Sequence, residues 1–216
     1  MARNFLEKLF GDEQMRLKER VEEAVTASVR LQRQFWEEQG EAVAAAARML
    51  AGVFKDGGRV FIFGNGGSAA DAQHLAAEFV NRFQIERPPL AAQALTTDTS
   101  IITAVGNDYD FNEIFVKQLR ALGRTGDLAW GISTSGASPN VIRGLQTARE
   151  LGLKTLACCG RDGGEVAPLA DIPLIVRSKD TPRIQEVQIT IGHILCDLVD
   201  FLLYPDKFAA TGSGGA

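Results

Sequence analysis

Apolar and polar residues follow two kinds of pattern along this chain. Short apolar runs are typical of buried strands, and longer segments with apolar residues every three or four positions are typical of helices. Strands are expected at residues 59–63, 90–95, 127–132, 154–158 and 172–176. Helices are expected at 69–83, 99–105, 112–122, 139–151 and about 183–203, with a short turn near 164–169. This alternation predicts an α/β fold, a three-layer sandwich in which helices cover both faces of a five-stranded parallel sheet.

The two ends of the chain lie outside this alternation. Residues 12–38 carry apolar side chains at near-helical spacing, which predicts an amphipathic helix. Gly40 is expected to end that helix, and a second helix then reaches about Phe54 before Gly57 and Gly58 stop it. Because no repeat or linker divides the sequence, we expect one domain. It comprises a helical segment at 1–58, the α/β core at 59–205 and a flexible tail at 206–216.

Composition narrows the function classes. The net charge of −4 gives no electrostatic case for nucleic-acid binding. No apolar run approaches the roughly 20 residues that a membrane span needs, and the N-terminus lacks a secretory apolar region, so a cytoplasmic protein with no membrane contact is expected. Three cysteines make no disulfide framework, and the adjacent Cys158 and Cys159 fall in an apolar run, as buried strand thiols do.

The first candidate site follows the strand at 59–63. Gly64-Asn65-Gly66-Gly67-Ser68 is a glycine-rich turn, in which Ser68 or Asn65 could cap the next helix. Such a turn lets backbone N–H groups approach an anion at a helix N-terminus, although many α/β proteins turn tightly for packing alone. On the helix, His74 and Glu78 lie one turn apart on one face. That spacing suits a metal-ligand pair or an acid/base pair.

A second loop follows the strand at 127–132. It reads Ser133-Thr134-Ser135-Gly136-Ala137-Ser138 and opens onto a helix that begins near Pro139. Hydroxyl groups, backbone N–H groups and a helix N-terminus together favour a phosphate, whereas the plain alternative is a loop that only caps its helix. Ligands of open α/β sheets bind at the carboxyl ends of the strands, where both loops must lie. The pair of loops therefore predicts a phosphorylated ligand.

Four segments make the prediction more specific. GNGGSAADAQHLAAEF, TTDTSIITAVGNDYDFNEIF, GISTSGASPNVI and RIQEVQITIGHIL resemble the sugar isomerase (SIS) domain, and within it the phosphoheptose isomerase family, over about residues 25–204. The resemblance implies a flavodoxin-like phosphosugar-binding domain. It also implies an enzyme that interconverts sedoheptulose 7-phosphate and D-glycero-D-manno-heptose 7-phosphate, at the head of ADP-heptose synthesis.

The resemblance also implies roles for individual residues. One zinc ion per subunit would be held by His74, Glu78, Gln185 and His193. The phosphate would lie in Ser133, Thr134, Ser135 and Ser138. The rest of the substrate would contact Asn65, Gly66, Gly67, Ser68, Glu78, Arg82, Asn107, Asp108 and Gln185. One position departs from the family pattern, because Pro182 stands where relatives can carry an acidic residue, although Asp180 is close by.

Elementary chemistry supports these assignments. Ketose–aldose isomerisation moves a proton between adjacent carbons through an enediol, so it needs a base, an acid and stabilisation of negative charge. Glu78 is a candidate base and His193 a candidate acid, with zinc able to polarise the carbonyl. The chain has only two histidines, and both stand at implied ligand positions. An ordinary helix histidine is the plain alternative for each, but a buried imidazole at His193 needs a partner.

Two other readings compete with the isomerase. A related tetrameric adaptor for the bacterial replication initiator shares the ending CDLVDFLLYP, but it lacks the ligand pair that Glu78 and His193 supply here. A regulatory phosphosugar-binding domain would be expected to accompany a basic DNA-binding region, which residues 1–38 do not offer.

A homotetramer with sites at its interfaces is expected both from the family and from the apolar surface of the helices at 12–38 and 183–203. Because Gln185 and His193 lie about 12 Å apart along a straight helix, one of them is expected to serve a site shared with a neighbouring subunit.

Overall fold

The molecule is built on one parallel β-sheet. This computed structural model describes the backbone of residues 2–211 and the side chains of residues 13–208. The sheet has five strands in the order β2-β1-β3-β4-β5, and each neighbouring pair is parallel. The strands are β1 (Val60–Gly64), β2 (Ala92–Ala94), β3 (Leu128–Ser133), β4 (Lys154–Gly160) and β5 (Ile172–Val176). All five predicted strands are present, and their order is the flavodoxin-like one.

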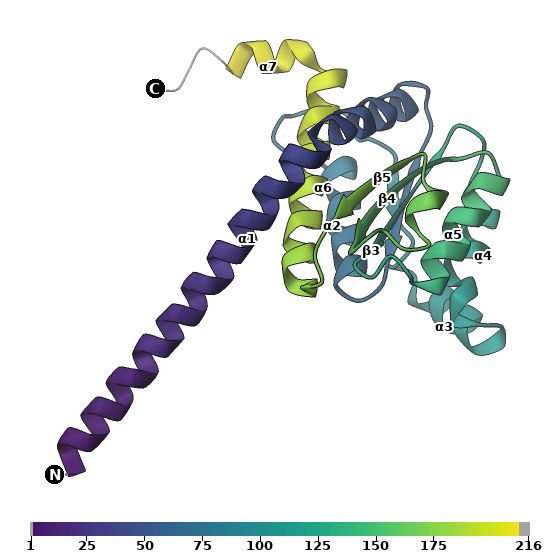
Figure 1. Cartoon of the computed structure of the whole chain (residues 1–216). Helices are drawn as coiled ribbons and strands as arrows, with labels where there is room; N and C mark the ends of the chain where they lie inside the picture. Colours follow the sequence, from purple (N-terminus) through teal and green to yellow (C-terminus); the bar gives the residue numbers. More distant parts are fainter. Residues whose placement is uncertain (1, 212–216) are drawn as a thin grey trace.

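Helices cover both faces of the sheet (Figure 1). Alternate residues of each strand point to opposite faces, so Val60 and Ile62 join one apolar cluster while Phe61 and Phe63 join the other. The first cluster is completed by α1 (Ala2–Lys55), α2 (Gly67–Val80) and α6 (Thr181–Leu203). The second is completed by α3 (Thr99–Asp108), α4 (Ile114–Leu122) and α5 (Pro139–Glu150). The three-layer sandwich is confirmed.

The N-terminal region differs from the prediction. One continuous helix, α1, replaces the two that were expected, and Gly40 lies inside it. A glycine in a helix interior costs only about 1 kcal/mol relative to alanine, and burial of Phe35 and Val43 on either side outweighs that cost. The helix ends as expected at Gly57, whose φ of 78° is left-handed, and the N–H of Gly58 donates to the carbonyl of Val53.

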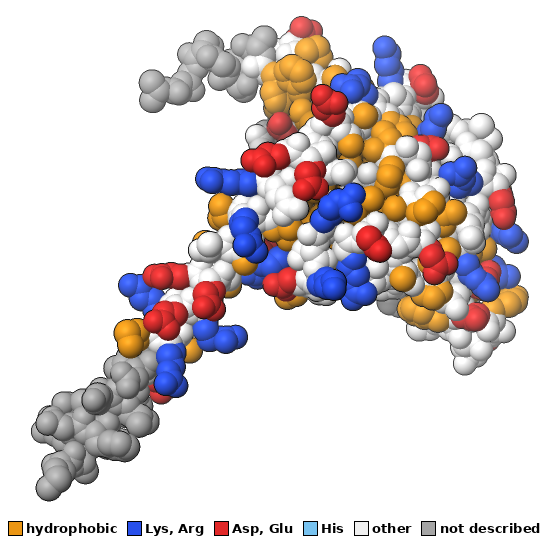
Figure 2. Space-filling view, in the orientation of Figure 1, with side chains coloured by type: hydrophobic (Ala, Val, Ile, Leu, Met, Phe, Trp, Pro, Cys, Tyr) orange, Lys and Arg blue, Asp and Glu red, His pale blue; other side chains and the backbone are white. Residues whose placement is uncertain are grey.

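The second half of α1 packs on the sandwich, and among the described side chains the buried apolar ones of this helix begin at Leu31. The first half projects away from the core (Figure 1), and on its described part charged side chains are interspersed with apolar ones (Figure 2). From residue 13 onward, the large apolar side chains exposed on this half are Met15, Leu17, Val21, Val25 and Val29.

The C-terminal region adds one element that the sequence reading did not anticipate. After α6 ends at Leu203, a short helix α7 (Pro205–Thr211) occupies the first part of the stretch expected to be a flexible tail. Residues 212–216 lie outside the described residues. Two short 3₁₀ helices, η1 (Phe111–Glu113) and η2 (Ala167–Leu169), complete the chain. No helix among the described residues is both long enough and apolar enough to cross a membrane.

Candidate active site

The two candidate loops lie side by side because of the strand order. Strands β1 and β3 are neighbours, and Gly64 at the end of β1 is in register with Ile132 near the end of β3. The chain then leaves toward opposite faces, since α2 packs in one apolar cluster and α5 in the other. This is the switch point of the sheet, where open α/β folds bind their ligands.

A pair of amide groups joins the two loops across the switch point. The Asn65 Nδ2 donates to Asn140 Oδ1, and the Asn140 Nδ2 donates back to Asn65 Oδ1, both at 2.8 Å. Asn140 is 2 % exposed. The sequence reading did not select Asn140, because an asparagine after Ser138-Pro139 looks like an ordinary helix start. Its partner could be found only from the strand order.

The glycines of the first loop are required by close approach. A Cβ on Gly64 would lie 2.8 Å from the carbonyl oxygen of Ile132, and a Cβ on Gly67 would lie 2.3 Å from Nε2 of Gln185. Gly66 has a φ of 54° and is itself the N-cap of α2, which has no side-chain cap. The expectation that Ser68 or Asn65 caps α2 is therefore wrong. It follows that the first turn of α2 keeps N–H groups without a side-chain acceptor.

The second loop gathers its hydroxyl groups. Ser133 Oγ lies 2.9 Å from Ser138 Oγ and 3.4 Å from Ser135 Oγ, and Ser135 Oγ accepts from the N–H of Ala137 at 3.1 Å. Ser138 is the N-cap residue of α5, yet its side chain makes no cap hydrogen bond. The plain reading of this loop, a serine that only caps its helix, does not describe this geometry. The hydroxyl groups converge on one another at a helix N-terminus, as a phosphate cradle requires.

Three of the four implied metal ligands converge from two helices. His74 and Glu78 lie on α2, and His193 lies on α6. The Nε2 atoms of His74 and His193 are 2.9 Å apart, and His74 Nε2 is 3.5 Å from Glu78 Oε1. Phe83 stacks on the His193 ring with centroids 5.6 Å apart. The side chain of Glu78 is 22 % exposed and that of His74 is 49 % exposed, so the cluster is open to solvent on one side.

This donor set fits a divalent ion. Two nitrogens bound to tetrahedral zinc at about 2.0–2.1 Å are about 3.4 Å apart, and the His74 and His193 Nε2 atoms, 2.9 Å apart, would have to separate by only about 0.5 Å to reach that geometry. Two imidazoles and a carboxylate also leave a position open, as catalytic zinc sites do. Among the side chains of residues 13–208, however, no three His, Cys, Asp or Glu residues already form a ready metal site. The cluster would still have to close around an ion.

Gln185 does not lie with the other three. It precedes His193 by two turns of α6, and its amide packs against Gly67 at the start of α2. Gln185 and His193 therefore lie apart along α6, as expected. His193 contacts His74, whereas Gln185 lies beside the glycine-rich loop. Gln188, on the next turn, donates to the carbonyl of Cys158 at 3.1 Å and anchors α6 to β4.

Other predicted substrate contacts are not brought into this cluster. Asn107 and Asp108 bond to each other at 2.8 Å at the end of α3, which packs on the opposite face of the sheet. Arg82 pairs with Glu86 at 3.5 Å on the surface beyond α2. Pro182 lies in the first turn of α6, a position that proline favours, so it needs no polar role there.

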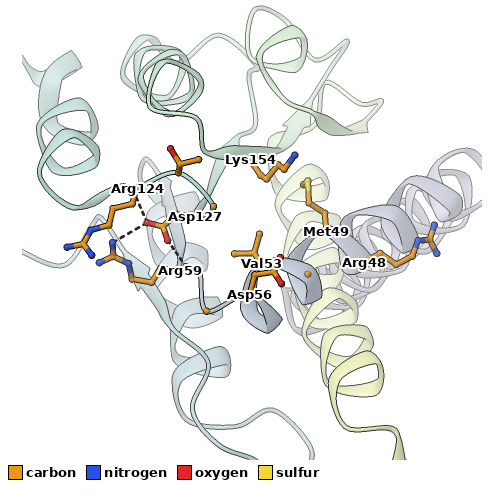
Figure 3. Close-up of a pocket in the computed structure, with 13 residues that line it drawn as sticks. Arg48, Met49, Val53, Asp56, Arg59, Arg124, Asp127 and Lys154 are labelled. Carbon is orange, nitrogen blue, oxygen red and sulfur yellow. Dashed lines mark hydrogen bonds and ion pairs between the residues drawn. The ribbon is translucent and has the colours of Figure 1, made fainter.

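A separate cavity of about 430 Å³ opens at the other end of the strands (Figure 3). Asp127, which precedes β3, accepts from the backbone and side chain of Arg59 and from the backbone N–H of Arg124. The side chain of Arg48 points away from the cavity in Figure 3. The basic side chains that line the cavity therefore do not all converge on one point. We assign no active site to this edge.

Comparison with known proteins shows the family of this chain. A family model described as SIS domain matches residues 25–160. A curated phosphoheptose isomerase from Nitratidesulfovibrio vulgaris strain Hildenborough is 55% identical over 189 residues, which is 88% of this chain and 90% of that protein. The chain belongs to the phosphoheptose isomerase family. The resemblance inferred from the four sequence segments is confirmed, and with it the expectation of an isomerase of this family.

Other members of the phosphoheptose isomerase family support the same conclusion. The relative from Aquifex aeolicus is 53% identical over 182 residues, 84% of this chain and 95% of that protein. The solved phosphoheptose isomerase from Neisseria gonorrhoeae superposes with a TM-score of 0.81 at 44% identity, covering 85% of this chain and 98% of that one. The sugar isomerase domain of an RpiR transcription factor from Sphaerobacter thermophilus, at 21% identity and a TM-score of 0.61, shares the fold alone.

Proposed function

We propose that this chain interconverts sedoheptulose 7-phosphate and D-glycero-D-manno-heptose 7-phosphate in the cytoplasm, as the first step toward ADP-heptose. The observation that carries the proposal is the convergence of His74, Glu78 and His193 from α2 and α6, in a chain whose second loop also gathers its hydroxyl groups at a helix N-terminus. A phosphate held by that loop would direct the sugar chain across the glycine-rich loop toward the carboxylate and the imidazoles.

Each residue has a defined part in this proposal. The phosphate is bound by Ser133, Thr134, Ser135 and Ser138. The side-chain amide of Asn65 orients a sugar hydroxyl, using the N–H and the oxygen lone pair that its two bonds to Asn140 do not occupy. Glu78 removes the proton from one carbon and returns it to the next. His193 supplies a proton to the oxygen that gains negative charge. A zinc ion, when bound, would polarise the carbonyl and stabilise the developing charge.

Replacement of Glu78 tests the proposal. The Glu78→Gln substitution keeps the shape of the side chain but removes the base, which should lower kcat for sedoheptulose 7-phosphate by about 10²–10⁴-fold. Glu86→Gln is the matched control, since its carboxylate lies nearby in the chain but is exposed and bonds only to Arg82. If Glu78→Gln turns over at the wild-type rate with its metal content unchanged, Glu78 is not the base.

Zinc, one ion per subunit, is part of the proposal. Support comes from a donor set of nitrogen and oxygen atoms with no thiolate, which zinc accepts although other divalent ions also can. Elemental analysis of protein purified without added metal should give close to one equivalent of zinc, and a strong chelator should abolish activity. Less than a tenth of an equivalent, with full activity in chelator, would remove the metal from the mechanism.

A homotetramer with sites at its interfaces is also proposed. It is supported by the apolar side chains exposed on the projecting half of α1, because monomers rarely expose such stripes. Since His193 contacts His74 within one chain, Gln185 is the ligand that a neighbouring subunit would share. Co-expressed Glu78→Gln and Gln185→Ala chains should then regain activity in mixed oligomers. Mixed oligomers as inactive as their parents would place the whole site in one chain, and a monomer by light scattering would exclude the assembly.

A further inference from the structure

A buried ion pair connects the segment after α2 to α6. The Nε of Arg87 donates to Asp200 Oδ1 at 2.7 Å, and the two side chains are 0 % and 1 % exposed. Burial raises the pKa of Asp200, and the hydrogen bond and charge of Arg87 oppose that rise. Breaking such a pair leaves an uncompensated charge inside the protein, so both side chains are held in place.

The rest of the Arg87 guanidinium holds the end of α2. Its Nη2 donates to the carbonyl of Glu78 at 2.9 Å, and its Nη1 donates to the carbonyl of Phe79 at 2.7 Å. The last carbonyls of a helix have no partner within the helix, so these bonds fix the turn that carries Glu78. A planar group with five donors in a fixed arrangement can make these bonds and the bond to Asp200 together, whereas a lysine cannot.

The same segment also touches the other catalytic helix directly. Phe83, four residues before Arg87, stacks on the ring of His193 with an interplanar angle of 26°. Asp200, the partner of Arg87, lies two turns after His193 on α6. The segment from residue 81 to residue 90 therefore contacts the helix of Glu78 through one side chain and the helix of His193 through two.

We propose that Arg87 is a positioning residue, which sets the separation of Glu78 and His193 by joining the last turn of α2 to Asp200. The inference rests on the proposed function, in which those two side chains act on one substrate. Arg87 itself is buried and does not contact the substrate. Its loss therefore lowers the chemical rate and leaves the binding of the phosphate loop unchanged.

A second arginine–aspartate pair provides a matched control. Arg59 bonds through Nη2 to Asp127 Oδ2 at 3.1 Å and to the carbonyl of Leu122 at 2.6 Å. It also holds a carboxylate and a backbone carbonyl, but these belong to the end of α4 and the residue before β3, not to α2 or α6 (Figure 3). Any effect of Arg87→Lys that Arg59→Lys reproduces is an effect on stability alone.

The experiment compares Arg87→Lys with Arg59→Lys under conditions where circular dichroism shows both to be folded. We expect Arg87→Lys to lower kcat for sedoheptulose 7-phosphate by about 10–100-fold with KM within about twofold of wild type. Arg59→Lys should leave both constants unchanged. Because the chain has only two histidines, imidazole NMR signals report on the site directly. Signals of His74 and His193 should shift in Arg87→Lys and not in Arg59→Lys.

The imidazole signals separate this inference from the proposed function. An inactive wild type would contradict the proposed function, and the signals of the two histidines would still show whether Arg87 holds the helices in register. A folded Arg87→Lys with wild-type kcat and wild-type signals would overturn the inference. If Arg87→Lys does not fold, Asp200→Asn, which removes the charge that holds Arg87 but keeps the size of the side chain, takes its place with the same expected loss of kcat and the same overturning result.

Discussion

Gly160 allows β4 to pass close behind the phosphate loop, and its replacement gives a prediction with a calculable size. A Cβ at this position would lie 2.2 Å from the carbonyl oxygen of Thr134 and 2.8 Å from Cδ1 of Ile184. A Cβ almost never lies within 3.0 Å of another heavy atom, so the backbone at Thr134 must move by about 0.8 Å in Gly160→Ala. Backbone cannot rotate aside as a side-chain end can, and the displaced segment is the loop that we propose binds the phosphate.

The expected cost follows from that displacement. Overpacking of this kind destabilises a protein by about 1–3 kcal/mol. A hydrogen bond to a charged group contributes about 1.5–3 kcal/mol, so the loss of one bond to the phosphate should raise KM by about 10–150-fold. Steady-state kinetics with sedoheptulose 7-phosphate and urea unfolding of the same protein measure both quantities.

Gly40→Ala is the control for Gly160→Ala. A Cβ on Gly40 meets nothing within 4 Å, and the residue lies inside α1, so alanine should stabilise the protein by about 0.5–1 kcal/mol and leave KM unchanged. If Gly160→Ala also keeps the wild-type KM and loses no stability, then the loop is not held against β4 as described and does not bind the phosphate in this geometry.

Three further predictions concern the loops, the helices and the thiols. Asn140→Asp removes one bond of the amide pair and turns an acceptor toward Asn65 Oδ1, so kcat/KM should fall by about 10–100-fold, and a wild-type value would contradict the role given to the pair. Gly192→Ala places a Cβ 2.4 Å from a methyl group of the fully buried Leu75, which should force α2 and α6 apart. The affinity for zinc, measured by competition with a chelator, should then fall, and an unchanged affinity would contradict this prediction. Iodoacetamide at pH 8 should label no thiol of the native protein and all three thiols in urea. The reason is that every cysteine is buried, and burial raises the pKa of Cys158 to about 12. Labelling of the native protein would refute this prediction.

The sequence was sufficient for the parts of the fold that depend on local pattern. Every strand and the helices of the α/β core were predicted within a few residues, because apolar runs and amphipathic periods reflect burial directly. The break expected at Gly40 was wrong, since helix propensity is weak and packing of Phe35 and Val43 decides the outcome. The helix that begins at Pro205 was missed because its start looks like a stop signal.

Parts of the site that depend on contacts between distant residues could not be predicted. His74 and Glu78 could be paired from their helical spacing, and the two loops from their places after strands. Asn140 pairs with Asn65 across 75 residues, and Arg87 pairs with Asp200 across 113 residues. No local pattern marks such partners. They become visible only when the strand order and the packing of α2 on α6 are known.

The central claim is that Glu78 transfers the proton between adjacent carbons of a phosphorylated ketose. Exchange with solvent measures this step most directly, since a base that removes a carbon-bound proton can return a deuteron in D₂O. The wild-type enzyme, incubated with sedoheptulose 7-phosphate in D₂O and followed by NMR, should place deuterium on the carbon next to the carbonyl. Glu78→Gln should exchange at least about 100-fold more slowly. Exchange by Glu78→Gln at the wild-type rate would contradict the account.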